Sequence, residues 1–310
     1  MLIDILIPTY QRASCIAKNL RHLHEQITKY GLEEKCRIIV SNNGSTDSTE
    51  AEIARFIATT DMPGLVVHLQ SDENVGLEKN VVKLALAATS DFVLWCGDDD
   101  YLADGYLPFV VASIQQRPGL GCVIPGLSSL HQNGDLIAGR VEDYETLVLE
   151  PGFESVHGYS HLGHQMSGLV LKRDNYIADY LAETACRNPY LFIYFVANRL
   201  LRHQGIYAPK YKTLVTVFNE KDWSYNGVGL LDEVFKSYRA LHGTLSNKQI
   251  DDLFLRFVVV HSYRLAFRPL RPRVLLSQYQ AMRRMPGVSK ALKWRLGYLF
   301  VREFTASLLK

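Results

Sequence analysis

The chain has 310 residues, 47% of them hydrophobic and 21% charged, with a formal net charge of +2. This balance is typical of an ordinary globular protein that is long enough for one large domain with an appendage, and so small a charge argues against a nucleic-acid partner. The first residues already read as a strand, the five cysteines lack metal-ligand spacing, and no apolar run is long enough to span a membrane. We therefore expect a cytoplasmic protein with reduced thiols and no signal peptide.

Strand-like and helix-like segments alternate through the first third of the chain. Apolar runs predict buried strands at residues 2–7, 36–40, 65–69 and 91–96, and amphipathic periodicity predicts helices at residues 14–30, 48–60 and 77–88. This order predicts an α/β fold with a Rossmann-like, mostly parallel sheet flanked by helices. Right-handed crossovers place the loops that follow these strands at one edge of the sheet.

The remaining sequence is less regular. Further strands are expected at residues 122–125, 167–171 and 205–209, a hairpin over 127–150 with its turn at 132–135, a Gly- and His-rich loop at 157–164, and an apolar helix at 189–203. From about residue 230 the pattern is helical, with a break at 268–272. We therefore divide the chain into an α/β domain, 1–225, and a helical C-terminal extension, 226–310.

Three consecutive carboxylates, Asp98, Asp99 and Asp100, follow the buried strand at 91–96. The carboxyl ends of the strands are where open α/β sheets bind ligands. Three adjacent acids repel one another, so a cation is expected among them, and carboxylate oxygens are preferred ligands of hard divalent ions. The alternative interpretation is a solvated acidic turn in which an Asp caps the next helix.

Four motifs in order resemble the nucleotide-sugar glycosyltransferases of family 2. They are Pro8-Thr9-Tyr10-Gln11-Arg12, the segment Val-Ser-Asn-Asn-Gly-Ser-Thr-Asp at 40–47, Asn74-Val75-Gly76 with Asn80, and the Asp triplet before Tyr101-Leu102. The resemblance covers roughly residues 3–105 and implies a GT-A fold. It further implies that residues 1–105 bind the nucleotide sugar and that residues 106–225 form the acceptor side.

The resemblance also implies the site residues and the metal. The donor-binding residues are Pro8, Thr9, Tyr10, Arg12, Asn42, Asn43, Asn74, Gly76, Lys79, Asp98 and Asp99. The metal is Mn²⁺ or Mg²⁺, which lowers the barrier to departure of a diphosphate. Because Gly97 takes the place of the family's first acid, Asp98, Asp99 and Asp100 all stay as candidate ligands.

Asn42 and Asn43 stand where the family usually has acids that read the base. Each Asn offers a donor and an acceptor, so it can read a uracil or a cytosine. A UDP or CDP sugar is therefore expected as donor, although Asn43-Gly44 is equally compatible with a plain turn.

The family's usual Glu-Asp pair before the helix at 189–203 is replaced by Arg187-Asn188-Pro189. An inverting transfer needs a base on the acceptor hydroxyl. By chain position the candidate catalytic bases are His161, His164, Glu154 and Asp222. Each histidine is also compatible with a structural role, and retention at the anomeric carbon stays open beside inversion.

Residues 264–310 are strongly basic, with Glu303 as the single acid in that sequence, and aromatic residues are interleaved. Basic amphipathic helices with Trp and Tyr predict binding to an anionic membrane surface. The alternatives are helices packed on the catalytic domain with a solvated basic face, or a nucleic-acid patch.

The resemblance to bacterial surface-polysaccharide enzymes implies an oligosaccharide acceptor linked to polyprenyl diphosphate. It also implies a role in O-antigen (lipopolysaccharide) or capsule synthesis at the inner face of the cytoplasmic membrane. The segment 95–100 and the Asn pair more weakly resemble abequosyl-type transferases, which implies a CDP-dideoxyhexose. Two other functions are kept open: a nucleotidyltransferase, which normally opens with a Gly-rich phosphate loop, and a catalytically degenerate sugar-nucleotide-binding protein.

Overall fold

The computed structural model describes residues 1–217, 229–262, 272–285 and 287–308. The strands are β1 Ile3–Thr9, β2 Cys36–Asn42, β3 Val66–Gln70, β4 Phe92–Trp95, β5 Leu120–His131, β6 Leu136–Ala138, β7 Leu147–Leu149, β8 Val170–Lys172 and β9 Gln204–Val217. The α-helices are α1 Ala13–Lys29, α2 Thr49–Thr59, α3 Leu77–Ala87, α4 Tyr106–Gln116, α5 Phe153–Tyr159, α6 Tyr176–Ala182, α7 Leu191–Arg202, α8 Gly229–Arg239, α9 Asn247–Val260, α10 Pro272–Arg284 and α11 Lys290–Leu308. Two short 3-10 helices are η1 Ser160–His164 and η2 Thr184–Cys186.

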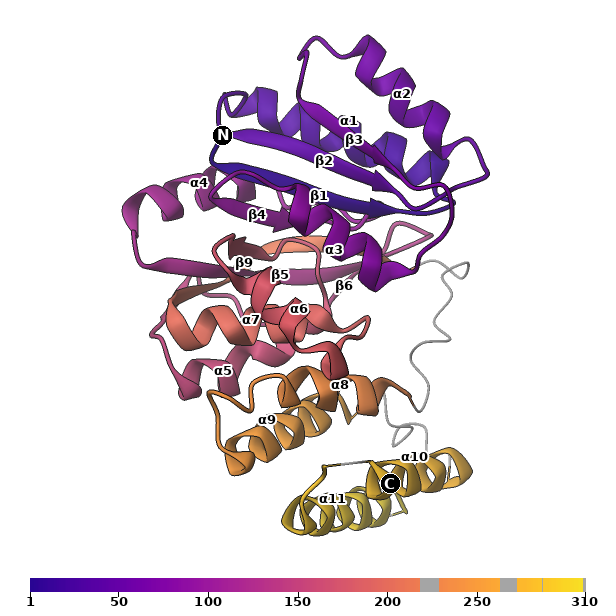
Figure 1. Cartoon of the computed structure of the whole chain (residues 1–310), viewed down its shortest axis with the longest axis vertical. Helices are drawn as coiled ribbons and strands as arrows, with labels where there is room; N and C mark the ends of the chain where they lie inside the picture. The colour runs from indigo at the N-terminus through magenta and orange to yellow at the C-terminus, as the bar shows by residue number, and fades with distance from the viewer. Residues whose placement is uncertain (218–228, 263–271, 286, 309–310) are drawn as a thin grey trace.

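Within these residues nine strands form one sheet, in the order β3-β2-β1-β4-β8-β5-β9-β7, with β6 beside β5. The pairs β1–β2, β1–β4, β2–β3 and β5–β9 are parallel. β8 enters antiparallel between β4 and β5. Figure 1 shows the helices lying against this twisted sheet. The fold is therefore mixed α/β with a mostly parallel central sheet, as the alternating segments predicted.

β1 is buried along its whole length because helices cover both faces of the sheet. Ile3, Ile5 and Ile7 belong to one core cluster with apolar residues of α1, whereas Leu6 belongs to the other core cluster, with residues of α3. This division follows from the alternation of side chains along a strand. The two cores fix β1 and β4 side by side, so the loops at their carboxyl ends meet.

Asp4 is a fully buried carboxylate at the start of β1. It accepts hydrogen bonds from Arg37 Nε and Nη2, both at 3.0 Å, from the backbone amides of Thr89 and Ser90 at 2.7 and 2.9 Å, and from the Ser90 hydroxyl at 2.8 Å. Asp4→Ala leaves these donors unpaired, so we expect it to lower the free energy of unfolding by about 3 kcal/mol. Chemical denaturation measures this. The matched change Asp104→Ala, at the exposed Lys29 pair, should have no measurable effect, and equal losses would contradict the assignment.

Residues 157–164 are helical rather than a loop, so that expectation was wrong. They lie in α5 and η1. A Cβ at Gly163 would lie 2.6 Å from the Phe192 carbonyl oxygen, so the glycine permits η1 to pack directly on the backbone of α7. Glycine here provides close approach between two helices, whereas in the sequence it suggested a loop.

The second half of the sheet also differs from expectation. β9 extends well beyond the expected strand at 205–209, because it pairs with β5 from Leu120 to His131. The hairpin expected over 127–150 exists only in its first part, where β5 and β6 pair around the predicted turn. β7, in the later part, pairs with β9 instead. These pairings join segments that are far apart in sequence.

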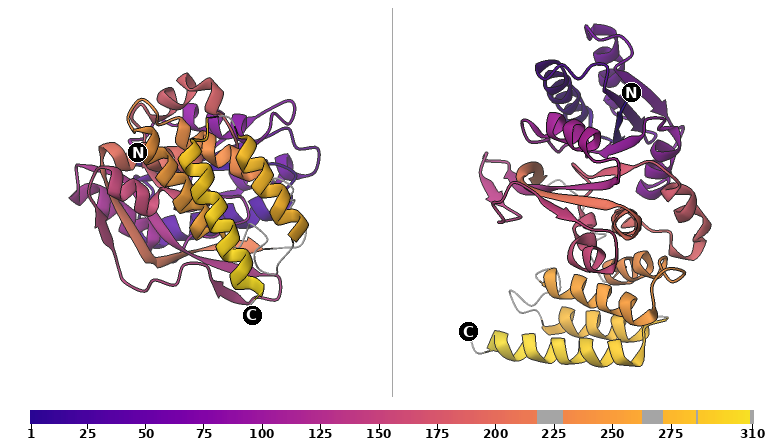
Figure 2. Two further views of the ribbon diagram at one scale, coloured as in Figure 1. Left: turned by 90° about the horizontal axis from the view of Figure 1, so that it is seen from below. Right: turned by 90° about the vertical axis from the view of Figure 1, so that its left-hand side faces the viewer.

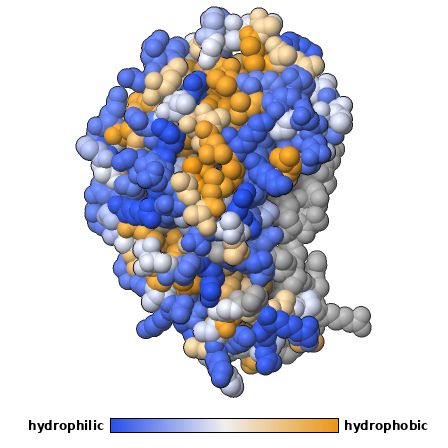
Figure 3. Space-filling view, viewed as in Figure 1, coloured by the Kyte–Doolittle hydropathy of each residue, from blue (hydrophilic) through white to orange (hydrophobic). Residues whose placement is uncertain are grey.

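Helices α8 to α11 form layers below the sheet, and α11 lies farthest from the N-terminal strands (Figure 2). On the face seen in Figure 3, the surface over α10 and α11 is mostly hydrophilic, and an apolar band runs over the region of α3 and its neighbouring strands. Asp222, the boundary at 225/226 and most of the break at 268–272 lie outside the described residues; the domain division stays a prediction. Among the helices that the structure describes, none combines the length and apolar character required to cross a bilayer.

Candidate active site

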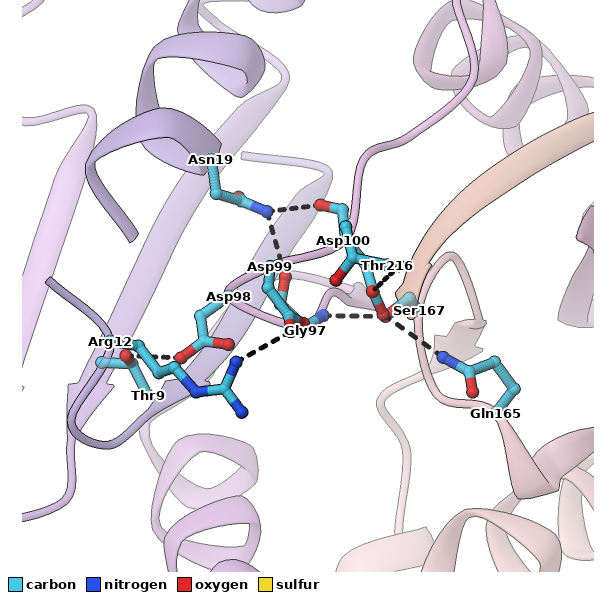
Figure 4. Close-up of polar contacts among 10 residues, drawn as sticks. All are labelled: Thr9, Arg12, Asn19, Gly97, Asp98, Asp99, Asp100, Gln165, Ser167 and Thr216. Carbon is cyan, nitrogen blue, oxygen red and sulfur yellow. Dashed lines mark hydrogen bonds and ion pairs between the residues drawn. The ribbon is translucent and has the colours of Figure 1, made fainter. Parts of the chain in front are cut away.

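The Asp triplet lies in the turn after β4, where the carboxyl ends of β1 and β4 meet (Figure 4). Asp98, Asp99 and Asp100 are 9%, 6% and 3% exposed. A solvated acidic turn would expose them, so that alternative does not fit. The three side chains do not all point the same way: Asp98 and Asp99 lie beside the loop after β1, and Asp100 faces the segment before β8.

Asp98 and Asp99 face the loop between β1 and α1. The Thr9 hydroxyl donates to Asp98 Oδ2 at 2.7 Å, and Arg12 Nη1 donates to Asp99 Oδ2 at 3.0 Å. Burial and the neighbouring charge of Asp99 raise the pKa of Asp98 to about 7. Burial lowers the pKa of Arg12, but the negative charges of Asp98 and Asp99 raise it by more. The pKa of Arg12 is therefore higher than its ordinary value. Burial and the adjacent Asp99 thus disfavour the charged form of Asp98, and a cation beside the pair would favour it.

Asp100 faces the opposite way. Its Oδ2 accepts from the Ser167 hydroxyl at 2.5 Å and from Gln165 Nε2 at 3.3 Å, and its Oδ1 accepts from the Thr216 backbone amide at 3.1 Å. These contacts join the acidic turn to the segment before β8 and to β9. Asp100 is thus held as a structural anchor of the turn.

Asn19 and Gly97 complete the turn. Asn19 Nδ2, from α1, donates to the carbonyls of Gly97 and Asp100 at 3.0 and 2.5 Å. A Cβ at Gly97 would lie 2.9 Å from Asp100 Oδ2, so only glycine permits this close approach. Sequence reasoning missed Asn19, Ser167 and Gln165, because nothing near them in the sequence indicates a contact with the triplet.

The loop after β1 is locked to the loop after β2 through Gln11. Gln11 has φ of 54°, a conformation that non-glycine residues rarely adopt. Its amide side chain donates to Thr46 Oγ1 at 2.8 Å and accepts from the Asp47 backbone amide at 3.1 Å, and these bonds offset the strain. Pro8 is buried at the end of β1, whereas Tyr10 is 40% exposed beside it.

Asn42 and Asn43 are buried, and their amides are engaged within the protein. Asn42 donates to Glu50 at 3.0 Å and accepts from the Ser45 amide at 3.2 Å. Asn43 donates to Asn74 Oδ1 at 2.8 Å and accepts from the Val75 amide at 3.1 Å. The pair thus positions the loops after β2 and β3.

The other expected donor residues lie beside these loops. Asn74 is exposed, and its Oδ1 also accepts from the Gly76 amide at 2.9 Å. Gly76, with φ of 86°, immediately precedes α3, and Lys79 is exposed in the first turn of that helix.

The candidate bases lie at the contact between η1 and α9. The His164 ring packs against His261 with centroids 4.3 Å apart, and its Nδ1 is 2.9 Å from the His161 carbonyl oxygen. A carbonyl only accepts, so Nδ1 carries the proton and Nε2 keeps the lone pair in neutral His164. His161 is 5% exposed, and burial together with neighbouring cationic groups lowers its pKa to about 3. Glu154 is exposed in the first turn of α5.

The position that lacks the family's acids holds an ion pair. Arg187, in the segment before α7, donates through Nε and Nη2 to the two carboxylate oxygens of Glu78 at 2.8 and 3.1 Å. Glu78 lies in the first turn of α3, directly after Asn74–Gly76. The segment before α7 is thereby tied to the start of α3, a contact that the sequence did not indicate.

The carboxylates of Asp98 and Asp99 are suitable ligands for a divalent cation. No three His, Cys, Asp or Glu side chains converge as a ready-made metal site in the part of the chain that the structure describes. Asp98 and Asp99, however, are adjacent buried carboxylates beside Arg12. Two carboxylates completed by diphosphate oxygens are a usual environment for Mg²⁺ and Mn²⁺.

Comparisons with known proteins agree with this arrangement. Residues 4–134 match the model of glycosyl transferase family 2, the range that contains β1 to β4 and the Asp triplet. No curated protein matches the chain.

Several solved structures share the fold. S. aureus TarS 1-349 in complex with UDP-GlcNAc has a TM-score of 0.68 at 16% identity, over 94% of this chain and 83% of that one. The mannosyltransferase PcManGT from Pyrobaculum calidifontis, in complex with GDP-Man and Mn²⁺, has a TM-score of 0.58 at 14% identity, over 99% of this chain and 83% of that one. GalNAc-T7 with UDP, GalNAc and Mn²⁺ has a TM-score of 0.57 at 12% identity, over 86% of this chain and 51% of that one. The chain therefore has the fold of GT-A glycosyltransferase structures, and its N-terminal part matches glycosyl transferase family 2.

Proposed function

We propose that the protein transfers a sugar from a nucleoside diphosphate sugar to an oligosaccharide acceptor. The observation that carries this proposal is the buried Asp98–Asp99 pair beside Arg12, at the carboxyl ends of β1 and β4. The match of residues 4–134 to glycosyl transferase family 2 and the nucleotide sugars in the similar structures support it. A nucleotidyltransferase is less well supported, because the loop at residues 8–12 is not a Gly-rich phosphate loop.

In this proposal Asp98 and Asp99 hold Mn²⁺ or Mg²⁺, and Arg12 contributes a further positive charge for the diphosphate. The bound metal would stabilise the charge of the departing nucleoside diphosphate. Thr9 orients Asp98, and Asp100 anchors the turn through Ser167 and β9. The loops at 8–12, 42–47 and 74–79 surround the donor.

For the base we favour His164 over His161. Burial and neighbouring cationic groups lower the pKa of His161 to about 3 and make it a weak base, whereas His164 is only half-buried. Asp222 and Glu154 stay as predictions, and so does the stereochemical outcome.

The finer identity of the reaction is part of the same proposal. A UDP or CDP sugar is the donor, with a CDP-dideoxyhexose of the abequose type as one case. The acceptor is linked to polyprenyl diphosphate in O-antigen or capsule synthesis, and the enzyme works at the inner face of the cytoplasmic membrane. The resemblance to surface-polysaccharide enzymes and the basic C-terminal helices support this assignment.

Thermal unfolding with a panel of nucleoside diphosphates tests the proposal. We expect UDP or CDP to raise the melting temperature in the presence of Mn²⁺ or Mg²⁺ and to have a much smaller effect in EDTA, because ligands that bind the folded state stabilise it. Transfer or slow hydrolysis of the matching nucleotide sugar would then separate an enzyme from a degenerate binding protein. Equal stabilisation in EDTA would contradict the role of the Asp pair.

A further inference from the structure

Helix α11 has two apolar faces, and its own packing requires only one. Leu292, Leu296 and Leu299 are buried against the neighbouring helices. Trp294 and Tyr298, in contrast, are 82% and 72% exposed. Val301, one turn further on, is 63% exposed. Trp294, Tyr298 and Val301 are spaced by four and three residues, so their side chains form one outward ridge.

The ridge borders an open groove of about 600 Å³ between α10 and α11. The groove is lined by Tyr279, Arg283, Lys290, Lys293, Trp294, Gly297, Tyr298 and Val301. Three of these side chains are cationic and none is acidic. Arg283 lies over the Tyr279 ring, with its guanidinium carbon 5.8 Å from the centroid, and a Cβ at Gly297 would meet the Tyr279 hydroxyl at 3.1 Å.

A second, shallower apolar surface lies on the other side of the ridge. Leu255 and Val259 of α9 line it together with Trp294, Tyr298 and Leu299. Arg295 borders this surface and is paired with Asp252 at 2.5 Å. Cationic side chains therefore flank the ridge on both sides, with Arg302 also lining the second surface.

We propose that this face of α10 and α11 docks on an anionic bilayer surface. Trp294, Tyr298 and Val301 would enter the boundary between headgroups and acyl chains, while Arg283, Lys290 and Lys293 contact headgroup phosphates. The inference rests on the membrane location in the proposed function and deepens it by naming the face.

The charge and position of the face favour a bilayer over a second copy of the chain. Two copies placed groove to groove would bring like charges together, whereas anionic headgroups complement them. The face lies on the outermost helices, away from the N-terminal strands (Figure 2). Apolar side chains that protrude between cations match the layered chemistry of a bilayer interface.

Co-sedimentation of the full chain with vesicles tests the proposal. We expect binding to mixed phosphatidylcholine–phosphatidylglycerol vesicles, weakened by salt, and little binding to phosphatidylcholine alone. Lys290→Gln/Lys293→Gln should weaken binding by about 25-fold, since each cation near such a surface contributes about fivefold. Trp294→Ala/Tyr298→Ala should weaken it by about tenfold or more, because apolar area leaves the interface.

Two matched double variants serve as controls. Lys18→Gln/Lys35→Gln removes two exposed charges of the α/β domain, and Leu136→Ala/Ile137→Ala removes exposed apolar area on β6. Both should bind vesicles like the wild type.

The proposal would be overturned if the protein bound neutral vesicles as well as anionic ones, or if the control variants lost as much binding as the test variants. It would also be overturned if the chain formed a dimer that Trp294→Ala/Tyr298→Ala dissociates. Nucleotide-induced thermal stabilisation should be unchanged in every variant. Failure of vesicle binding with nucleotide binding intact therefore rejects this face alone, whereas failure of nucleotide binding in the wild type rejects the proposed function.

Discussion

Asp99→Asn should lower kcat/KM for sugar transfer by about 1000-fold and leave the melting temperature unchanged or higher. Asp99 is a buried carboxylate beside Asp98, with Arg12 at 3.0 Å as counter-ion. Neutralising it removes a metal ligand, which is worth several kcal/mol in transition-state charge stabilisation. It also relieves the repulsion between the two carboxylates, so folding does not suffer.

Steady-state kinetics with saturating Mn²⁺, together with thermal unfolding, measure both parts of this prediction. The matched control is Asp104→Asn, an exposed acid in the same segment that pairs with Lys29. It should retain full activity. If Asp99→Asn kept a tenth or more of wild-type activity, Asp99 could not be the principal ligand.

Asp100→Ala should lower the free energy of unfolding by about 3 kcal/mol, as much as Asp4→Ala. The substitution leaves the Ser167 hydroxyl, Gln165 Nε2 and the buried amide of Thr216 without their acceptor. Each unpaired buried group costs about 1 to 3 kcal/mol. Chemical denaturation measures the loss, and activity should fall as the turn loosens.

Asp100→Asn separates an anchor from a metal ligand. The carbonyl oxygen of the introduced amide can still accept from the Thr216 backbone amide, and its NH₂ group can donate to the Ser167 oxygen, because a hydroxyl also accepts. We expect most of the stability and most of the transfer activity to remain. A variant that is stable but inactive would instead assign Asp100 to the metal.

The N-terminal half of the sheet could be predicted from sequence because its signals are local. Strands β1 to β4 are short apolar runs, and each intervening helix has its own amphipathic period. The alternating order of these strands and helices also predicted that the Asp triplet lies at the carboxyl edge of the sheet. The second half depends on long-range pairing, such as β9 with β5, which no local pattern specifies.

The residues around the triplet were predictable only in part. Motif order identified Thr9 and Arg12, which contact Asp98 and Asp99. The partners of Asp100 come from segments 65 to 116 residues away, and their residue types are common throughout the chain. That Asn42 and Asn43 read a base stays a prediction, and local sequence does not reveal that their amides also bond Glu50 and Asn74.

Calorimetric titration of UDP and CDP, in Mn²⁺ and in EDTA, tests the central claim most directly. We expect one of the two nucleotides to bind wild-type protein at least about tenfold more tightly with Mn²⁺, and Asp99→Asn to abolish the difference. Equal affinity of the wild type in Mn²⁺ and EDTA, or an undiminished Mn²⁺ effect in Asp99→Asn, would contradict it.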